Sequence, residues 1–151
     1  MKMGRCMVES CTEIDKRIGQ YRHLLPLAIL PADREIIDRL IERLREERTR
    51  LHENQMGRWH MVKGMTYNYM GRYEDAILQE QAALDSGDST WTVYVHLAVA
   101  NAFLGRQSEA DAAAAQARKL NPKLTVKWYG ARLDAPETIH EGLRKAVVPE
   151  E

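Results

Sequence analysis

The chain has 151 residues, which is enough for one domain that buries a core without disulfides or metals. Lys plus Arg and Asp plus Glu both number 22, so the formal net charge is zero, which argues against nucleic-acid or membrane partners held by charge. The sequence shows no secretory signal and no apolar run long enough to span a bilayer, so we expect a cytoplasmic protein. A single Phe, only nine Gly and abundant Ala, Leu, Glu and Arg favour an all-α fold.

Residues 1–56 are predicted to form an N-terminal helical hairpin. One helix carries apolar residues at alternating spacings of three and four, namely Cys11, Ile14, Ile18, Tyr21, Leu25 and Ala28. Pro26 should kink or end this helix, and a second helix should begin near Pro31, where proline suits a first turn. Its apolar stripe consists of Ile37, Ile41, Leu44 and Leu51. The charged run from Arg43 to Arg50 is interpreted as a solvated face, with a dimerising helix as the alternative.

The two cysteines, Cys6 and Cys11, lie close together near the start of the chain. No second pair and no nearby histidine completes a zinc set or a disulfide framework. We therefore interpret both as free thiols in a reducing compartment, without assigning them a role.

A repeated motif organises residues 57–124. Gly71-Arg-Tyr-Glu-Asp-Ala76 and Gly105-Arg-Gln-Ser-Glu-Ala110 share the pattern Gly-Arg-x-x-acid-Ala at a separation of 34 residues. Each glycine falls where a helix must stop and the chain reverse, a position that favours positive φ. The register predicts two repeats, 57–90 and 91–124, with helices near 57–70, 73–85, 91–104 and 107–120.

This period and motif resemble the tetratricopeptide repeat (TPR) family. Further positions agree with its signature: Gly64, Tyr67, Tyr73, Ala83, Leu97, Ala98, Ala117 and Pro122, the last as a helix start. Other positions depart from it, because Glu80 and Ala114 stand where an aromatic is usual, which should weaken packing between repeats. Asp88 replaces a closing proline, and Gln107 replaces the aromatic that Tyr73 supplies in the first repeat. The resemblance implies a short α-solenoid that binds a peptide or helix of a partner protein.

Residues 125–151 are predicted to form capping helices and a tail, because a repeat array cannot bury its own end faces. Trp128 stands at the signature position of an incomplete third repeat. The segment around Gly142-Leu-Arg-Lys145 is similar to the tail of TPR regions in bacterial signalling proteins that contain class III nucleotide cyclases or winged-helix regulators. This similarity implies an accessory or regulatory context and carries over no activity.

No constellation of residues points to catalysis. The five histidines are scattered without metal-ligand spacing, no glycine-rich loop follows a predicted strand, and no serine sits on a strand-to-helix turn. We therefore expect no enzyme activity, no cofactor and no metal.

The family resemblance implies a concave groove lined by the first helix of each repeat. Its lining residues would be Met61, Met65, Asn68, Tyr69, Val95, Val99, Ala102 and Phe103. Such an apolar, methionine-containing surface suits adaptable peptide binding. Two alternatives stay open: a groove filled by the N-terminal hairpin, and a homodimer assembled through Ile14, Ile18, Ile37, Ile41 and Leu44.

Overall fold

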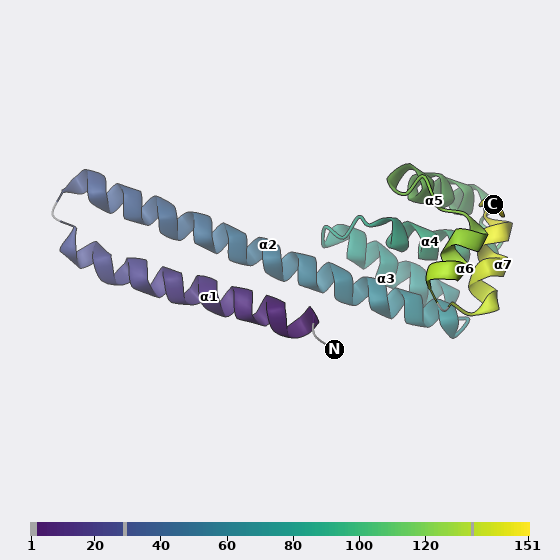
Figure 1. Ribbon diagram of the computed structural model, residues 1–151, viewed down its shortest axis with the longest axis horizontal. Helices are drawn as coiled ribbons and strands as arrows, with labels where there is room; N and C mark the ends of the chain where they lie inside the picture. The colour runs from purple at the N-terminus through teal and green to yellow at the C-terminus, as the bar shows by residue number, and fades with distance from the viewer. Residues whose placement is uncertain (1–2, 29, 134) are drawn as a thin grey trace. The chain divides into compact units, whose positions relative to one another are not determined.

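The computed structural model describes residues 3–28, 30–133 and 135–151, with side chains described from Ser10 onward. The described residues are helical with no β-strand, so the all-α prediction is confirmed (Figure 1). The helices in chain order are α1 (Met3–Leu24), a 3₁₀ turn η1 (Leu25–Leu27), α2 (Pro31–Tyr69), α3 (Tyr73–Asp85), α4 (Trp91–Phe103), α5 (Gln107–Leu120), α6 (Val126–Arg132) and α7 (Glu137–Lys145). They form two compact units, Met1–Glu53 and Asn54–Glu151.

The first unit is the predicted helical hairpin. Within it, α1 and the first part of α2 lie side by side and are joined at η1 (Figure 1). Its core consists of Ile14, Ile18, Ile41 and Leu44, with Tyr21, Leu25, Ile37 and Leu51 partly buried against them. The predicted apolar seams therefore meet. Cys11 is a half-buried free thiol, whereas the side chain of Cys6 lies outside the described residues.

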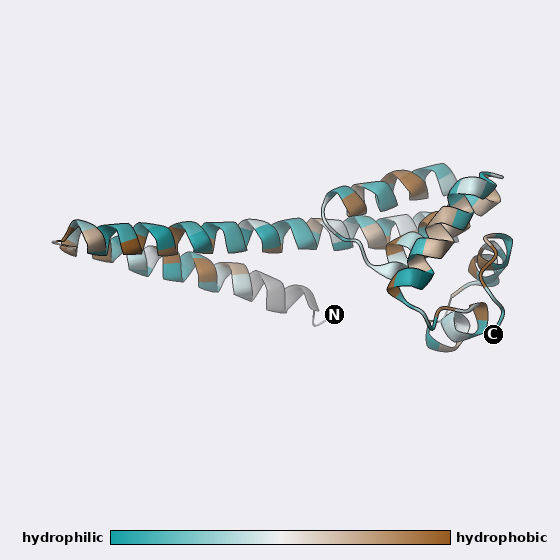
Figure 2. Ribbon diagram, turned by 90° about the horizontal axis from the view of Figure 1, so that it is seen from above, coloured by the Kyte–Doolittle hydropathy of each residue, from teal (hydrophilic) through white to brown (hydrophobic). Residues whose placement is uncertain are grey.

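Helix α2 differs from the prediction because it continues without a break through the predicted boundary at residues 56 and 57. No proline occurs between Pro31 and Pro122, so nothing in the sequence forces the helix to end. Two glycines within the helix allow close approach of other segments. A Cβ at Gly57 would lie 2.8 Å from the Cβ of Asp88, and one at Gly64 would lie 2.5 Å from Oε1 of Glu80. Figure 2 shows α2 as mostly hydrophilic, with isolated hydrophobic residues along it.

The turns after α2 and α4 have the same backbone geometry. Gly71 and Gly105 have φ of +71° and +72°. The amide of Arg72 donates to the carbonyl of Tyr67 at 2.9 Å, and the amide of Arg106 donates to that of Asn101 at 2.9 Å. These bonds close the helix ends in the left-handed cap that glycine permits. The sequence motif and its left-handed helix cap thus recur at the same separation of 34 residues. The predicted helices 73–85 and 107–120 agree with α3 and α5, and α4 ends at Phe103, one residue before the predicted end.

Helix α4 forms the centre of the second unit. It packs against α3, α5 and α7, and its buried residues are Val93, Val95, His96, Leu97, Ala98, Val99, Ala100, Asn101 and Ala102. The small side chains of Ala110, Ala114 and Ala117 on α5 allow close packing in the same core. Pro122 does not start a helix as predicted, because it lies in the turn between α5 and α6.

The C-terminal segment closes this core. The side chains of Tyr129 on α6 and of Ile139 and Leu143 on α7 are fully buried. The amide of Val126 donates to the carbonyl of Pro149 at 2.9 Å, so the last residues run along the start of α6. Within the described ranges, no helix is both long enough and apolar enough to cross a membrane.

Candidate functional site

Helix α7 covers the α4 half of the predicted groove. Val95 and Val99 are fully buried and Ala102 is nearly so, in one core with Ile139 and Leu143. A Cβ at Gly142 would lie 2.6 Å from Cγ1 of Val99, so the two helices are in close contact. The C-terminal helix therefore occupies the surface that the resemblance implied for a peptide.

Phe103, the fourth α4 residue of the predicted groove, is only partly buried. Its ring is stacked on that of Tyr73 with centroids 4.6 Å apart and planes 8° apart. The Nζ of Lys145 lies 4.5 Å from the Phe103 ring centroid, in cation–π contact. Phe103 thus joins α3, α4 and α7 at the edge of the core.

The α2 half of the predicted groove is more open. Met61 is half-buried, and its sulfur accepts a hydrogen bond from the Thr92 hydroxyl at 3.2 Å. Met65 is also half-buried, and Tyr69 is exposed. Asn68, in contrast, is buried, and its amide donates to the carbonyl of His96 at 3.0 Å. On this half, Met61 and Met65 keep part of their surface exposed, and the exposed Tyr69 packs edge-on against the His96 ring with centroids 6.2 Å apart.

A buried polar layer lies behind this surface, between α2, α3 and α4. Neither carboxyl oxygen of Glu80, the Oδ1 of Asn68 nor the Nδ1 of His96 has a hydrogen-bond partner within the described part of the chain. Burial, with a smaller contribution from the nearby charge of Asp88, raises the pKa of Glu80 to about 9. Burial lowers the pKa of His96 to about 4. At neutral pH both side chains are therefore uncharged.

The two ionisable groups of this layer, the Glu80 carboxyl and the His96 imidazole, are therefore both held in their neutral forms by burial. Among the residues whose structure is described, no group of three or more His, Cys, Asp or Glu side chains is placed to hold a metal ion. The sequence signal for this layer was Glu80 itself, a charged residue at an apolar position of the repeat.

A second surface, which the sequence analysis missed, is a groove between α3 and α5 with α4 as its floor. It has a volume of about 530 Å³. Its apolar lining comprises Ile77, Leu84, Tyr94, Leu97, Ala112 and Ala113, and its polar lining comprises Gln81, Asn101, Arg106, Glu109 and Gln116. An apolar floor with a polar rim is the usual anatomy of a peptide or protein contact. The pattern was hidden because these residues come from three helices.

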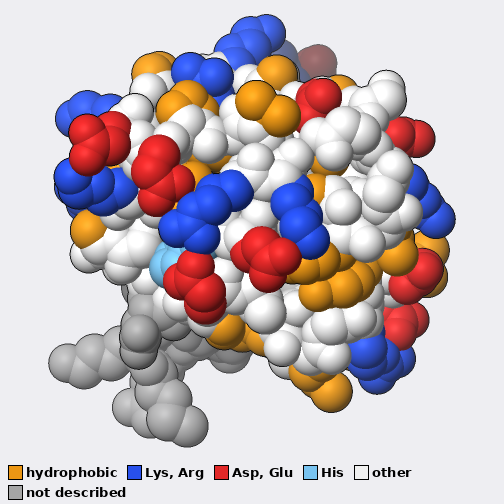
Figure 3. Space-filling view, turned by 90° about the vertical axis from the view of Figure 1, so that its right-hand side faces the viewer, with side chains coloured by type: hydrophobic (Ala, Val, Ile, Leu, Met, Phe, Trp, Pro, Cys, Tyr) orange, Lys and Arg blue, Asp and Glu red, His pale blue; other side chains and the backbone are white. Residues whose placement is uncertain are grey.

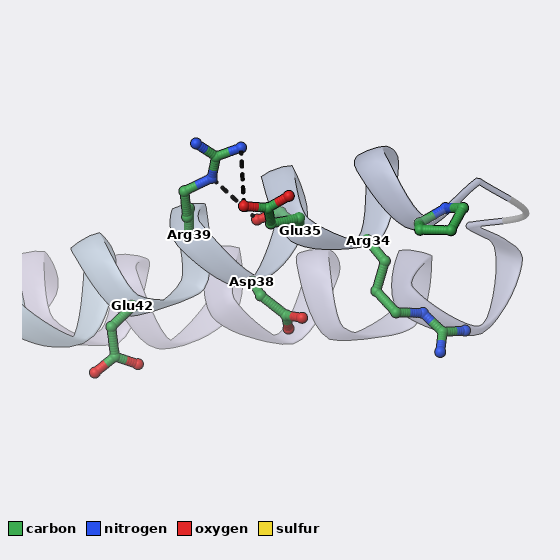
Figure 4. A pocket seen from close by; sticks show the side chains of 6 residues that line it. Arg34, Glu35, Asp38, Arg39 and Glu42 are labelled. Atoms are coloured by element: carbon green, nitrogen blue, oxygen red, sulfur yellow. Dashed lines mark hydrogen bonds and ion pairs between the residues drawn. The ribbon is translucent and has the colours of Figure 1, made fainter.

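A shallower hollow of similar volume lies on the first unit, along the start of α2. It is lined by Pro31 and by side chains of both signs, and Glu35 pairs with Arg39 across one helical turn (Figure 4). Its two arginines, Arg34 and Arg39, lie among three carboxylates, those of Glu35, Asp38 and Glu42, so the hollow carries no strong excess of either sign.

Charge is also balanced on the outer face of the C-terminal helices. Arg144 on α7 pairs with Glu137 at 2.7 Å and with Glu150 at 3.1 Å, and Lys145 pairs with Glu141 at 2.9 Å. Figure 3 shows acidic and basic side chains interspersed on this end of the molecule, with hydrophobic patches between them. This face therefore presents no field of one sign for a polyanion.

No protein-family model, curated protein or solved structure matches this chain. The functional argument therefore depends on the geometry of the surfaces described above.

Proposed function

We propose that this chain is a non-catalytic protein–protein interaction module of the tetratricopeptide type. The repetition of Gly71 and Gly105, with matching φ values and matching cap hydrogen bonds, supports two consecutive helix pairs of one design. Close approach of helices at Gly64 and Ala98 supports the same interpretation. Modules of this kind bind short segments of partner proteins.

The observation that carries the proposal is the apolar groove between α3 and α5. Its floor on α4 is partly uncovered, although the rest of α4 is among the most buried parts of the chain. A segment of a partner that presents one or two large apolar side chains would remove this floor from water, at about 25 cal/mol per Å² of apolar area. The rim residues Arg106 and Glu109 would orient it through charged contacts.

Filling the groove tests the proposal. Ala112 lines the groove and is exposed, so Ala112→Trp should block it without disturbing the core. Ala115→Trp is the matched control, because Ala115 is an exposed alanine of the same helix that does not line the groove. Met65→Glu tests the open part of the inner surface in parallel.

The measurement is affinity purification of each variant from an extract of the source cells, with mass spectrometry and a melting curve. The proposal expects at least one protein that co-purifies with wild type and with Ala115→Trp but is lost with Ala112→Trp or Met65→Glu at unchanged Tm. The C-terminal similarity suggests a cyclase-type or winged-helix signalling protein as the partner class. If no protein depends on either surface, the proposal fails.

A second candidate function is self-assembly through the N-terminal hairpin. The specific observation is that Leu24, Leu27, Leu30 and Ile36, at the turn between α1 and α2, are exposed. Four large apolar side chains at one tip are more than a monomeric surface commonly gathers. Sedimentation equilibrium would show a dimer that Leu27→Glu dissociates; a monomer at all concentrations contradicts this candidate.

A further inference from the structure

Four exposed apolar side chains lie on one face of α2 within the second unit, together with Lys63 and Thr66. We call this face the α2 stripe; it consists of Met56, Trp59, Val62, Lys63, Thr66 and Met70. Spacings of three and four place these residues on one face of the helix. Trp59 is 59% exposed, Val62 49% and Met70 62%. Tryptophan exposed to this extent is typical of interaction surfaces.

The second helix pair shows what covers such a face. Thirty-four residues after Trp59, Val62 and Thr66 stand Val93, His96 and Ala100 of α4, and all three are buried. The same face is therefore covered in α4 and open in α2.

Helix α3 supplies much of the cover on α4. Ala83, Ile77 and Leu84 pack against Val93 and Leu97 in one apolar cluster. Helix α3 contains no Lys or Arg, and its carboxylates lie away from this apolar contact, since Glu74 and Asp85 are exposed and Asp75 pairs with Arg72. The molecule thus contains its own example of the kind of helix that fits this face.

We propose that the α2 stripe docks an acidic amphipathic helix of a partner protein, in the way that α3 packs on α4. This inference rests on the proposed function, because it assigns a docking surface to the same interaction module. The predicted groove and the α3–α5 groove are separate surfaces from this one.

The charge of the stripe indicates the sign of the partner. Lys63 stands where α4 has Leu97, so the stripe carries a cation at a position that is apolar in the second pair. Its Nζ lies 5.2 Å from the Trp59 ring centroid and 5.8 Å from that of Tyr67. Within the described residues Lys63 makes no ion pair with a carboxylate. A carboxylate on the docked helix would therefore give Lys63 an ion-pair partner.

The same cation disfavours a second copy of this chain as the occupant. The stripe extends from Met56 to Met70, and Lys63 is its midpoint. A two-fold axis that packs two stripes antiparallel would pass beside residue 63 and place the two Lys63 ammonium groups near each other. Two like charges repel each other strongly in an interface from which water is excluded, so they oppose association.

The probe for the test is a fluorescein-labelled peptide with the sequence of residues 73–85, stapled between positions 78 and 82 because a helix of this length is marginal in water. A neutral twin carries Gln and Asn in place of its four carboxylates, and a basic twin carries Lys there. Anisotropy titrations compare the full chain with Trp59→Ala, Lys63→Glu and, as matched control, Leu78→Ala, whose side chain is exposed elsewhere in the same unit.

The inference expects saturable binding of the acidic peptide, about tenfold weaker binding to Trp59→Ala, and no change for Leu78→Ala. The neutral twin should bind several-fold more weakly than the acidic peptide, and Lys63→Glu should prefer the basic twin. Absence of saturable binding overturns the inference. Binding that ignores Trp59 also overturns it, because the peptide would then be replacing α3 on α4. A dimer of the full chain that Trp59→Ala dissociates overturns it as well.

The purification described above separates this inference from the proposed function. A partner that is lost with Ala112→Trp or Met65→Glu but kept by Trp59→Ala leaves the interaction module intact and removes only the α2 stripe as its surface. If no partner depends on any of these variants, the proposed function fails; peptide binding that depends on Trp59 would then show the stripe to be a helix-binding surface outside that function.

Discussion

The two units of this molecule are both helical, but different interactions hold them. Among the described side chains of the unit of residues 1–53, four are buried, and ion pairs such as Arg48 with Asp15 at 3.1 Å lie in solvent, where each contributes little. In the unit Asn54–Glu151, α4 is buried along most of its length. Helix formation is therefore no measure of tertiary stability. The hairpin should open at a small cost in free energy, whereas opening the second unit exposes a continuous core.

The largest expected effect separates the two cores directly. Leu143 is fully buried between α7 and α4, so Leu143→Ala should lower the free energy of unfolding of the second unit by about 3 kcal/mol. Ile41→Ala should increase hydrogen exchange in α1 and leave the exchange of α4 unchanged. Hydrogen-exchange mass spectrometry of both variants makes the measurement. One common transition that includes α1 and α4 in both variants would contradict the division into units.

A pH dependence of stability is expected for the second unit. The folded pKa of Glu80, about 9, lies above its ordinary value of 4.5, so the folded state holds an extra proton and stability falls as pH rises through that window. The folded pKa of His96, about 4, lies below its ordinary 6.5, so its contribution rises with pH between those values. The two effects oppose each other below pH 6.5. A net loss of stability is expected between about pH 6.5 and 9.

Replacement of the carboxyl checks this assignment. Glu80→Met removes two buried oxygens without hydrogen-bond partners and should raise the free energy of unfolding at pH 8 by about 2 kcal/mol. The variant's stability should also be level from pH 6.5 to 9. Urea titrations at four pH values test both points; a slope that survives in Glu80→Met would have to come from other groups.

The smallest expected effect concerns the end of α7. Val147 has φ of +55°, and the amide of Val148 donates to the carbonyl of Leu143, which is the cap that Gly71 and Gly105 form elsewhere. A β-branched residue is strained in this conformation, and Val147 is exposed, so little packing is lost on its removal. Val147→Gly should therefore raise the free energy of unfolding by about 1 kcal/mol. Gly105→Val should do the opposite, and equal melting temperatures for all three proteins would refute the argument.

The sequence predicted the helices well because residues close together in the chain determine where a helix begins and ends. The Gly-Arg-x-x-acid-Ala motif contains the turn glycine and the small residue of the next helix, so Gly105 and Ala110 suffice to place α5. Separate helices were expected before and after residue 56, whereas α2 runs from Pro31 to Tyr69, because a change of tertiary surroundings along α2 does not interrupt its backbone. Spacing along one helix carries no information about which distant helix covers it.

The binding surface was harder to predict for the same reason. Helix α7 packs on Val95 and Val99 through its apolar residues Ile139 and Leu143. The sequence around these two residues does not indicate which helix they pack against. The sequence marked Glu80 as unusual at an apolar position, but it did not show that burial neutralises this carboxyl next to Gly64.

The hydrogen bonds at the carboxyl end decide where the protein can be labelled. The carbonyls of Pro149 and Glu150 accept from the amides of Val126 and Lys127, the first two residues of α6. These two amides have no acceptor within their own helix, so the terminal residues act as its cap. A fluorophore, surface tether or fusion partner joined directly to Glu151 would disturb these two hydrogen bonds. It would thereby also disturb the packing of α6 in the core that includes α4. A dye at an exposed site on α5, such as Ala115, would report on the same unit without loading it.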